Sequence, residues 1–172
     1  MKIRTMVFLA SLLLTTICRA DVLVGVSPEG SAQQLVMSTL SSARQSIYVM
    51  GYSFTSPEVV KALIVAKRRG VDVRVVLDSK GNQDRASVAA MNLLVNAGIA
   101  VRTVDNYKIM HDKIAIIDDV TTQTGSFNYS RAAARSNSEN VVVMRNMPEV
   151  AQVYLGHWQS RWSQGQAWQS SY

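Results

Sequence analysis

The sequence predicts an α/β fold in which helices pack in layers on a central β-sheet. Apolar runs of strand length alternate along the chain with longer stretches of helical periodicity, and this alternation is typical of layered α/β domains. The chain has 172 residues, of which 48% are apolar and 17% are charged. That size and composition suit a globular domain with a sizeable core. No linker-like stretch divides the chain, so we expect a single domain.

The first half of the chain alternates between expected strands and expected helices. In order, these are a strand at 22–26, a helix at 30–44, a strand at 47–54, a helix at 57–69 and a strand at 71–77. The first helix places Leu35 and Leu40 on one side, as helices do when they pack on a sheet. Ser56 before Pro57 gives the second helix an N-cap and a proline at its first position, and Gly70 ends it.

The second half continues the same alternation. It contains a helix at 85–96, strands at 99–104 and 114–117, a further strand at 139–144 and a closing helix from 148 to about 162. Gly98 follows the first of these helices and ends it. Tyr154, Trp158 and Trp162 recur four residues apart on the closing helix, and we interpret this apolar stripe as core packing.

The first twenty residues have the features of a secretory signal peptide. Lys2 and Arg4 precede a mostly apolar run at 6–17, and Ala20 offers a small residue for cleavage. We expect residues 1–20 to be removed and residues 21–172 to form a domain that is periplasmic or secreted; an uncleaved membrane anchor is the alternative. Cleavage would also remove Arg19, lowering the formal charge from +6 to +3, and would remove the single cysteine, Cys18.

Four polar residues flank the short strand at 114–117 in a pattern that brings them together. Residues two apart in a strand share a face, so His111 lies with Lys113, and Ser126 lies with Asn128. An antiparallel hairpin that turns at 119–120 would pair Lys113 with Ser126 and His111 with Asn128, with β-carbons roughly 5 Å apart. We therefore expect imidazole, ammonium, hydroxyl and carboxamide groups to converge on one patch.

This patch has the chemistry of a phosphate site, because converging donors bind anions. Lys113 would neutralise the charge that grows in a five-coordinate transition state. His111 could act as a nucleophile near neutral pH. A nucleophilic imidazole needs an acceptor on its other ring nitrogen, and Glu139, which opens the next strand, is a candidate. Several aspartates could suggest a hard-metal site, but their spacing matches no known metal motif.

The spacing of these residues resembles the HKD motif of the phospholipase D superfamily. The matching positions are His111-x-Lys113-x4-Asp118-x6-Gly125-Ser126-x-Asn128. The segments YSFTSPEVVKALIVAKRRGVDVRVVLD, NSENVVVM and HWQSRW extend the resemblance to small periplasmic endonucleases of this superfamily over nearly the whole mature chain. The resemblance implies an α/β/α sandwich with a central mixed sheet, and a metal-independent phosphodiesterase without a cofactor.

The resemblance also implies a role for each matching residue. His111 corresponds to the nucleophilic histidine, and Lys113 and Asn128 correspond to the phosphate-binding pair. Ser126 corresponds to a hydroxyl that helps to shape the phosphate pocket. Glu139 corresponds to the carboxylate that orients the histidine.

The third letter of the motif, Asp118, completes an expected catalytic set with His111, Lys113 and Glu139. In a continuous strand, Asp118 would point to the face opposite to that of His111 and Lys113. We therefore expect Asp118 to support the site without touching the phosphate.

One HKD motif is present, whereas the larger family members carry two in one chain. The chemistry needs one imidazole to attack phosphorus and another to protonate the leaving oxygen, and His157 lacks the motif. We expect an identical subunit to supply the second imidazole in a homodimer, as in the single-motif relatives.

The leading hypothesis is therefore an endonuclease of broad specificity that hydrolyses DNA, with RNA as a second candidate substrate, through a phosphohistidine intermediate. One alternative is a lipid phosphodiesterase of the phospholipase D type. The mature sequence shows no amphipathic or long apolar segment for docking on a bilayer, so no stable membrane association is expected. Another alternative is a nucleic-acid-binding module without catalysis, although binding alone does not need a positioned imidazole.

Overall fold

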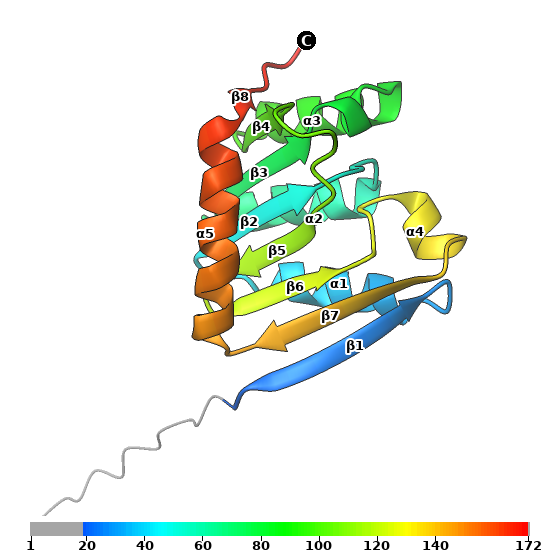
Figure 1. Cartoon of the computed structure of the whole chain (residues 1–172), viewed down its shortest axis with the longest axis vertical. Helices are drawn as coiled ribbons and strands as arrows, with labels where there is room; N and C mark the ends of the chain where they lie inside the picture. Colours follow the sequence, from blue (N-terminus) through cyan, green and yellow to red (C-terminus); the bar gives the residue numbers. More distant parts are fainter. Residues whose placement is uncertain (1–18, 172) are drawn as a thin grey trace, which may run out of the picture.

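The computed structural model describes residues 19–171 as an eight-stranded mixed β-sheet between two helical layers (Figure 1). The expected signal peptide lies outside the described residues, apart from its last two positions. The sheet order is β1-β7-β6-β5-β2-β3-β4-β8. In chain order the strands are β1 (Asp21–Ser27), β2 (Ser46–Gly51), β3 (Asp72–Asp78), β4 (Ala100–Val104), β5 (Lys113–Ile117), β6 (Thr121–Gly125), β7 (Glu139–Arg145) and β8 (Gln166–Ala167).

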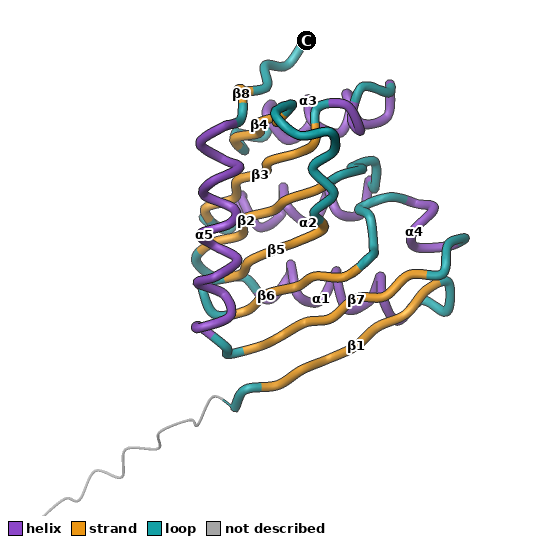
Figure 2. Tube along the Cα trace, viewed as in Figure 1, coloured by secondary structure: helices purple, strands orange, loops and turns teal. Residues whose placement is uncertain are grey.

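The helices form one layer on each face of the sheet, as Figure 2 also shows. Three of them cover one face, and these are α1 (Ser31–Ser42), α2 (Pro57–Arg68) and α3 (Arg85–Asn96). The long helix α5 (Pro148–Gln164) crosses the other face. Strands β2, β3 and β4 are parallel, and the other neighbouring pairs are antiparallel. The predicted α/β/α sandwich with a central mixed sheet is confirmed.

Two short helices lie in the connections, η1 (Lys80–Asn82) after β3 and α4 (Arg131–Arg135) between β6 and β7. Neither they nor the two-residue strand β8 was predicted, because elements this short show no clear hydrophobic period. Within residues 19–171, no helix has both the length and the apolar character needed to cross a bilayer.

Each face of the sheet has its own core. Leu63 of α2 and Leu94 of α3 are buried in the core between the sheet and the three-helix layer. On the other face, Trp158 of α5 stacks on Tyr48 of β2 at 4.6 Å and on Trp162 at 4.9 Å between ring centroids. The interpretation of the tryptophan stripe as core packing is therefore confirmed.

The end of β2 departs from the prediction. Ser56 caps α2 as expected, because its hydroxyl accepts a hydrogen bond from the Val59 N–H at 3.3 Å. However, β2 ends at Gly51 and not at Phe54. The side chain of Asn82 bonds to the backbone of Tyr52 and Phe54, and so it replaces the sheet hydrogen bonds of that segment.

The predicted β5–β6 register is wrong by one residue. The structure pairs Ala115 with Gln123 and Ile117 with Thr121, so the register places Gly125, and not Ser126, opposite Lys113. The connection has three residues, 118–120, where the sequence suggested two. Asp118 and Asp119 both take left-handed backbone angles, with φ of 52° and 57°. An aspartate tolerates this conformation better than most residues, and a three-residue connection moves every pair by one position.

Asp118 fastens this turn to the rest of the domain. Its Oδ1 accepts hydrogen bonds from the N–H groups of Gln45 at 2.7 Å and Ser46 at 2.9 Å. Its Oδ2 accepts one from the Arg44 N–H at 3.0 Å. These three donors lie where the chain passes from α1 to β2. The third letter of the motif therefore joins the hairpin turn to the neighbouring strand.

Asp118→Asn should lower the free energy of unfolding by about 1–2 kcal/mol, because a neutral amide replaces a charged acceptor of three N–H groups. The matched control is Asp119→Asn in the same turn, whose Oδ1 has no hydrogen-bond partner. Chemical denaturation of both variants measures the difference. Equal stability of the two variants would contradict a stabilising role of the three hydrogen bonds to Asp118. A loss of turnover in Asp118→Asn protein that remains folded would contradict a role that is only structural.

Candidate active site

A polar cleft of about 470 Å³ opens at the edge of the sheet where β6 ends and where β5 and β7 begin. The residues that line it are His111, Lys113, Gly125, Ser126, Asn128 and Glu139. All of the sequence-predicted site residues except Asp118 are in this set. The fold thus brings together two segments of the motif and the first residue of β7.

Lys113 is the buried cation of the cleft. It opens β5, and only 5% of the residue is exposed. Its Nζ donates a hydrogen bond to the backbone carbonyl of His111 at 2.8 Å and lies 5.2 Å from the centroid of the Tyr52 ring. Burial lowers the pKa of Lys113, while the nearby carboxylates of Asp112 and Glu139 act in the opposite direction. Because desolvation prevails, a bound anion would be a favourable partner for this ammonium.

His111 precedes β5 and extends its imidazole into the cleft. The ring packs edge-on against Tyr52, with 4.8 Å between the ring centroids. The expected hydrogen bond from the His111 ring to the Glu139 carboxylate is not formed in this structure. Instead, the Glu139 carboxylate accepts a hydrogen bond from Asn137 Nδ2 at 2.9 Å. Glu139 thus shares the cleft with His111, but within one subunit it does not hold the imidazole.

Ser126 and Asn128 reach the cleft although the register differs from the prediction. The chain leaves β6 at Gly125, whose φ of 140° and close approach to the Asn140 carbonyl leave no room for a β-carbon. The Ser126 N–H then donates to Asn140 O at 3.1 Å, and its Oγ accepts from the Asn140 N–H at 3.0 Å. The hydroxyl hydrogen of Ser126 therefore remains available for a ligand.

Asn128 is half-buried at the cleft, and its Oδ1 is a buried atom that has no hydrogen-bond partner. The two ends of an amide are nearly equal in shape, and the opposite orientation presents two N–H donors at the same place. Asn128 can therefore meet an acceptor such as a phosphate oxygen or a donor such as a hydroxyl.

Asp118 does not belong to the cleft, and its inclusion in the catalytic set is corrected. It follows the opposite end of β5, roughly 16 Å from Lys113 at the rise of an extended strand, and its carboxylate is engaged by backbone N–H groups. The expectation that it supports the site without touching a phosphate agrees with this placement.

Sequence reasoning missed Tyr52, which contacts both His111 and Lys113. It follows the last residue of β2. The available signal was its position directly after a buried strand, since the ends of neighbouring strands in α/β sheets often carry site residues. Among residues 19–171, no three His, Cys, Asp or Glu side chains come together as candidate metal ligands.

Comparisons with known proteins agree on one family. The family model for the cardiolipin synthase, PLD-like domain matches residues 36–162. A phospholipase D of Rickettsia bellii is 33% identical over 148 residues, which cover 86% of this chain and 72% of that protein. The mitochondrial cardiolipin hydrolase of Mus musculus is 32% identical over 136 residues, covering 79% of this chain and 60% of that protein.

Among solved structures, the crystal structure of Nuc from Salmonella typhimurium, a phospholipase D family member, matches with a TM-score of 0.88. The two chains are 55% identical, and the match covers 88% of this chain and 100% of that one. The fold, the family match and the relatives therefore agree with one another. The chain belongs to the phospholipase D superfamily and is a phosphodiesterase, a hydrolase, of that superfamily.

Proposed function

We propose that this protein is an exported, metal-independent endonuclease that hydrolyses the phosphodiester bonds of DNA, with RNA as a second substrate. The observation that carries the proposal is the polar cleft where the buried Lys113 ammonium lies beside His111. Apart from Gly125, every residue that lines this cleft is polar, which suits a sugar-phosphate backbone. The N-terminal sequence supports cleavage after Ala20, export to the periplasm or beyond, and a single domain at 21–172.

The proposed reaction uses two imidazoles at one phosphate. The unprotonated nitrogen of one His111 attacks phosphorus; a P–N bond forms and the P–O bond to the leaving sugar oxygen breaks. The protonated His111 of the partner subunit gives its proton to that oxygen. The neutral ring then takes a proton from water, the water oxygen attacks phosphorus, and the P–N bond breaks to release the phosphate product.

The chain itself supplies the charge stabilisation that a metal ion provides in other phosphodiesterases. Lys113 contributes a full positive charge, and its hydrogen bond to the His111 carbonyl keeps this charge next to the nucleophile. The free hydroxyl hydrogen of Ser126 and the amide of Asn128 add neutral donors at the same cleft. These groups form the proposed phosphate-binding set.

The second imidazole requires a second copy of the chain. The sequence contains two histidines, and only His111 lines the cleft. His157 lies on α5, where its Nε2 is 3.1 Å from Asp112 Oδ1. A monomer therefore has one imidazole for two roles, and a two-fold axis beside the cleft would provide the other.

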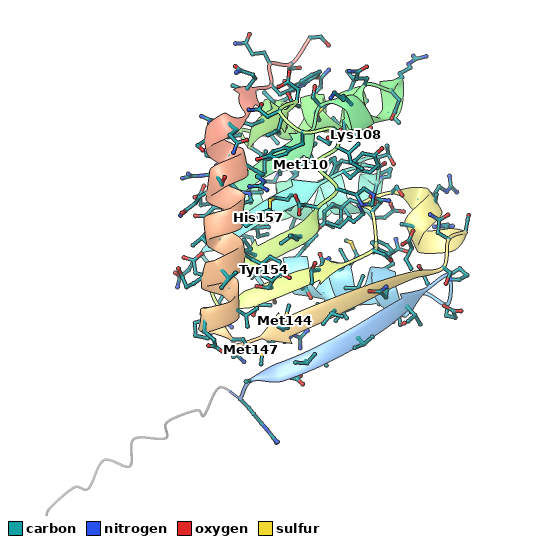
Figure 3. All side chains as sticks on the ribbon, in the orientation of Figure 1. Lys108, Met110, Met144, Met147, Tyr154 and His157 are labelled. Atoms are coloured by element: carbon teal, nitrogen blue, oxygen red, sulfur yellow. The ribbon has the colours of Figure 1, made fainter. Side chains whose placement is uncertain are left out.

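The uncovered part of the α5 face supports such a dimer. Helix α5 packs on β6, β5, β2, β3 and β4, so β1 and β7 lie beyond it. On β1, Val22, Val24 and Val26 are 53%, 66% and 44% exposed, and they point away from α1 because Gly25 faces that helix. Figure 3 shows Met144 on this same open face and Met147 at the start of α5. An apolar sheet face of this kind is typical of a surface that another subunit covers.

Hydrolysis of lipid phosphodiesters is the second candidate function, favoured by the relatives named phospholipase D and mitochondrial cardiolipin hydrolase. The polar lining of the cleft is the observation that ranks it below nuclease activity, since the cleft offers no apolar wall for an acyl chain.

Purified mature protein should cleave DNA in excess EDTA, because Lys113 and the imidazoles supply the charge and the protons. The assay compares DNA, RNA, phosphatidylcholine and cardiolipin side by side, with and without added magnesium. Activity that EDTA abolishes and magnesium restores would contradict the metal-independent route. Faster cleavage of either lipid than of both nucleic acids would favour the second candidate function.

Phosphate affinity should decline as pH rises through the lowered pKa of Lys113, because only the protonated ammonium attracts the anion. Competitive inhibition by inorganic phosphate, measured from about pH 7 to 10, should weaken at a pH below the ordinary lysine range. The control is Lys113→Arg, which keeps its charge throughout and should lose this pH dependence even if turnover is low. A decline of the same size in Lys113→Arg would assign the effect to another group.

Mixing wild-type and His111→Ala chains should reveal the shared site. If each site needs both His111 rings, random exchange at equal ratio leaves about a quarter of the dimers wholly wild-type, so activity falls to about half of its value before exchange. Mixing tagged with untagged wild-type chains verifies that subunits exchange. The same mixture is the control, because its activity should not fall. Activity that stays constant after verified exchange would show that each chain carries a complete site.

A further inference from the structure

Two buried polar side chains at the end of β3 lie next to the candidate active site, and neither is part of the motif. Asp78 is 1% exposed and Asn82 is 2% exposed. A carboxylate and a carboxamide buried to this extent need a full set of partners. Their partners are the backbone segments that carry Tyr52 and His111.

Asp78 holds the segment that leads into His111. Its Oδ2 accepts a hydrogen bond from the Met110 N–H at 2.6 Å, and its Oδ1 accepts one from the Gly81 N–H at 2.6 Å. Both are short bonds to a buried carboxylate, a strong type of hydrogen bond. The backbone directly before His111 is therefore tied to the end of β3.

Asn82 holds the segment that carries Tyr52. Its Nδ2 donates to Tyr52 O at 2.6 Å and to Asp78 O at 2.8 Å. Its Oδ1 accepts from the Phe54 N–H at 2.9 Å. The amide thus makes two backbone bonds where β2 leaves the sheet and a third to Asp78, which connects this segment to the end of β3.

Tyr52, whose backbone Asn82 holds, contacts two residues of the motif, His111 and Lys113. Its ring lies 4.8 Å from the His111 ring and 5.2 Å from Lys113 Nζ. Gly81 packs closely against Tyr52, since a β-carbon at Gly81 would come within 2.7 Å of Tyr52 O and 3.0 Å of the Tyr52 ring. Because Glu139 bonds to Asn137 and not to His111, the ring contact with Tyr52 is a restraint on how the His111 imidazole can turn.

We propose that Asp78 and Asn82 form a buried positioning unit that aims His111 through two routes, the backbone of Met110 and the ring of Tyr52. This inference rests on the proposed role of His111 as the nucleophile. Asp78, Asn82 and Tyr52 are positioning residues, because none of them lines the cleft where the phosphate would bind. Their contribution should be to turnover, since a displacement of about 1 Å at a nucleophile costs up to about 100-fold in rate.

Tyr52 provides the sharper test, because it is partly exposed and its replacement should leave the core intact. Tyr52→Leu should lower kcat for DNA cleavage about 10- to 100-fold, while KM changes less than about threefold. Tyr52→Phe should avoid most of that loss, because it keeps the aromatic ring that packs against His111. A Tyr52→Leu enzyme with the kcat of Tyr52→Phe, in folded protein, would overturn the proposal.

Asp78→Asn tests the other route, with Asp72→Asn as its matched control. Asp72 opens the same strand, and its carboxylate bonds to Tyr48 and Arg74 on the far side from the cleft. Asp78→Asn should lose kcat at nearly constant KM, whereas Asp72→Asn should keep its kcat. Equal losses of kcat would overturn the proposal, and if Asp78→Asn does not fold, the Tyr52 pair decides. Wild-type protein inactive on every phosphodiester would instead refute the proposed function.

Discussion

Burial of β5 on both faces is the constraint on which the site depends. Ile114 and Ile116 belong to the core under α5, and Ala115 and Ile117 belong to the core on the opposite face. A strand with no exposed face cannot hold a charged side chain in its middle without a large desolvation cost. The charged residues of the HKD motif are therefore confined to the two ends of β5. His111 and Lys113 lie in the cleft at the first end, and Asp118 fastens the turn at the other.

At the chemical end, the structure places an ammonium where water solvates it poorly. Lys113 is buried and its ammonium donates a hydrogen bond to the neutral carbonyl of His111, while Glu139 bonds to Asn137. A buried cation without a carboxylate partner favours a bound anion more strongly than an exposed lysine does. The same hydrogen bond links the cation to the backbone of His111, the proposed nucleophile, so the fold positions both groups together.

The proposed dimer would account for both the uncovered part of the sheet and the single imidazole of the cleft. One imidazole lines the cleft, and β1, which lies beyond α5 in the sheet (Figure 1), exposes Val22, Val24 and Val26. A symmetric dimer would cover apolar area and supply the missing proton donor in one step. Within the subunit, Asp78 and Asn82 add a rigid support behind the cleft, which is the kind of preorganisation that an accurately placed nucleophile needs.

The sequence by itself determined the α/β architecture, the start of α2 at Ser56 and Pro57, and the membership of His111 and Lys113 in one site. These features depend on local periodicity, on capping and on motif spacing, all of which act over a few residues. The tertiary structure alone decided the β5–β6 register and the partner of Glu139. It also decided the contact of Tyr52 with His111, because these residues lie far apart in sequence. They meet only where the ends of β2 and β3 and the segment before β5 share one sheet edge.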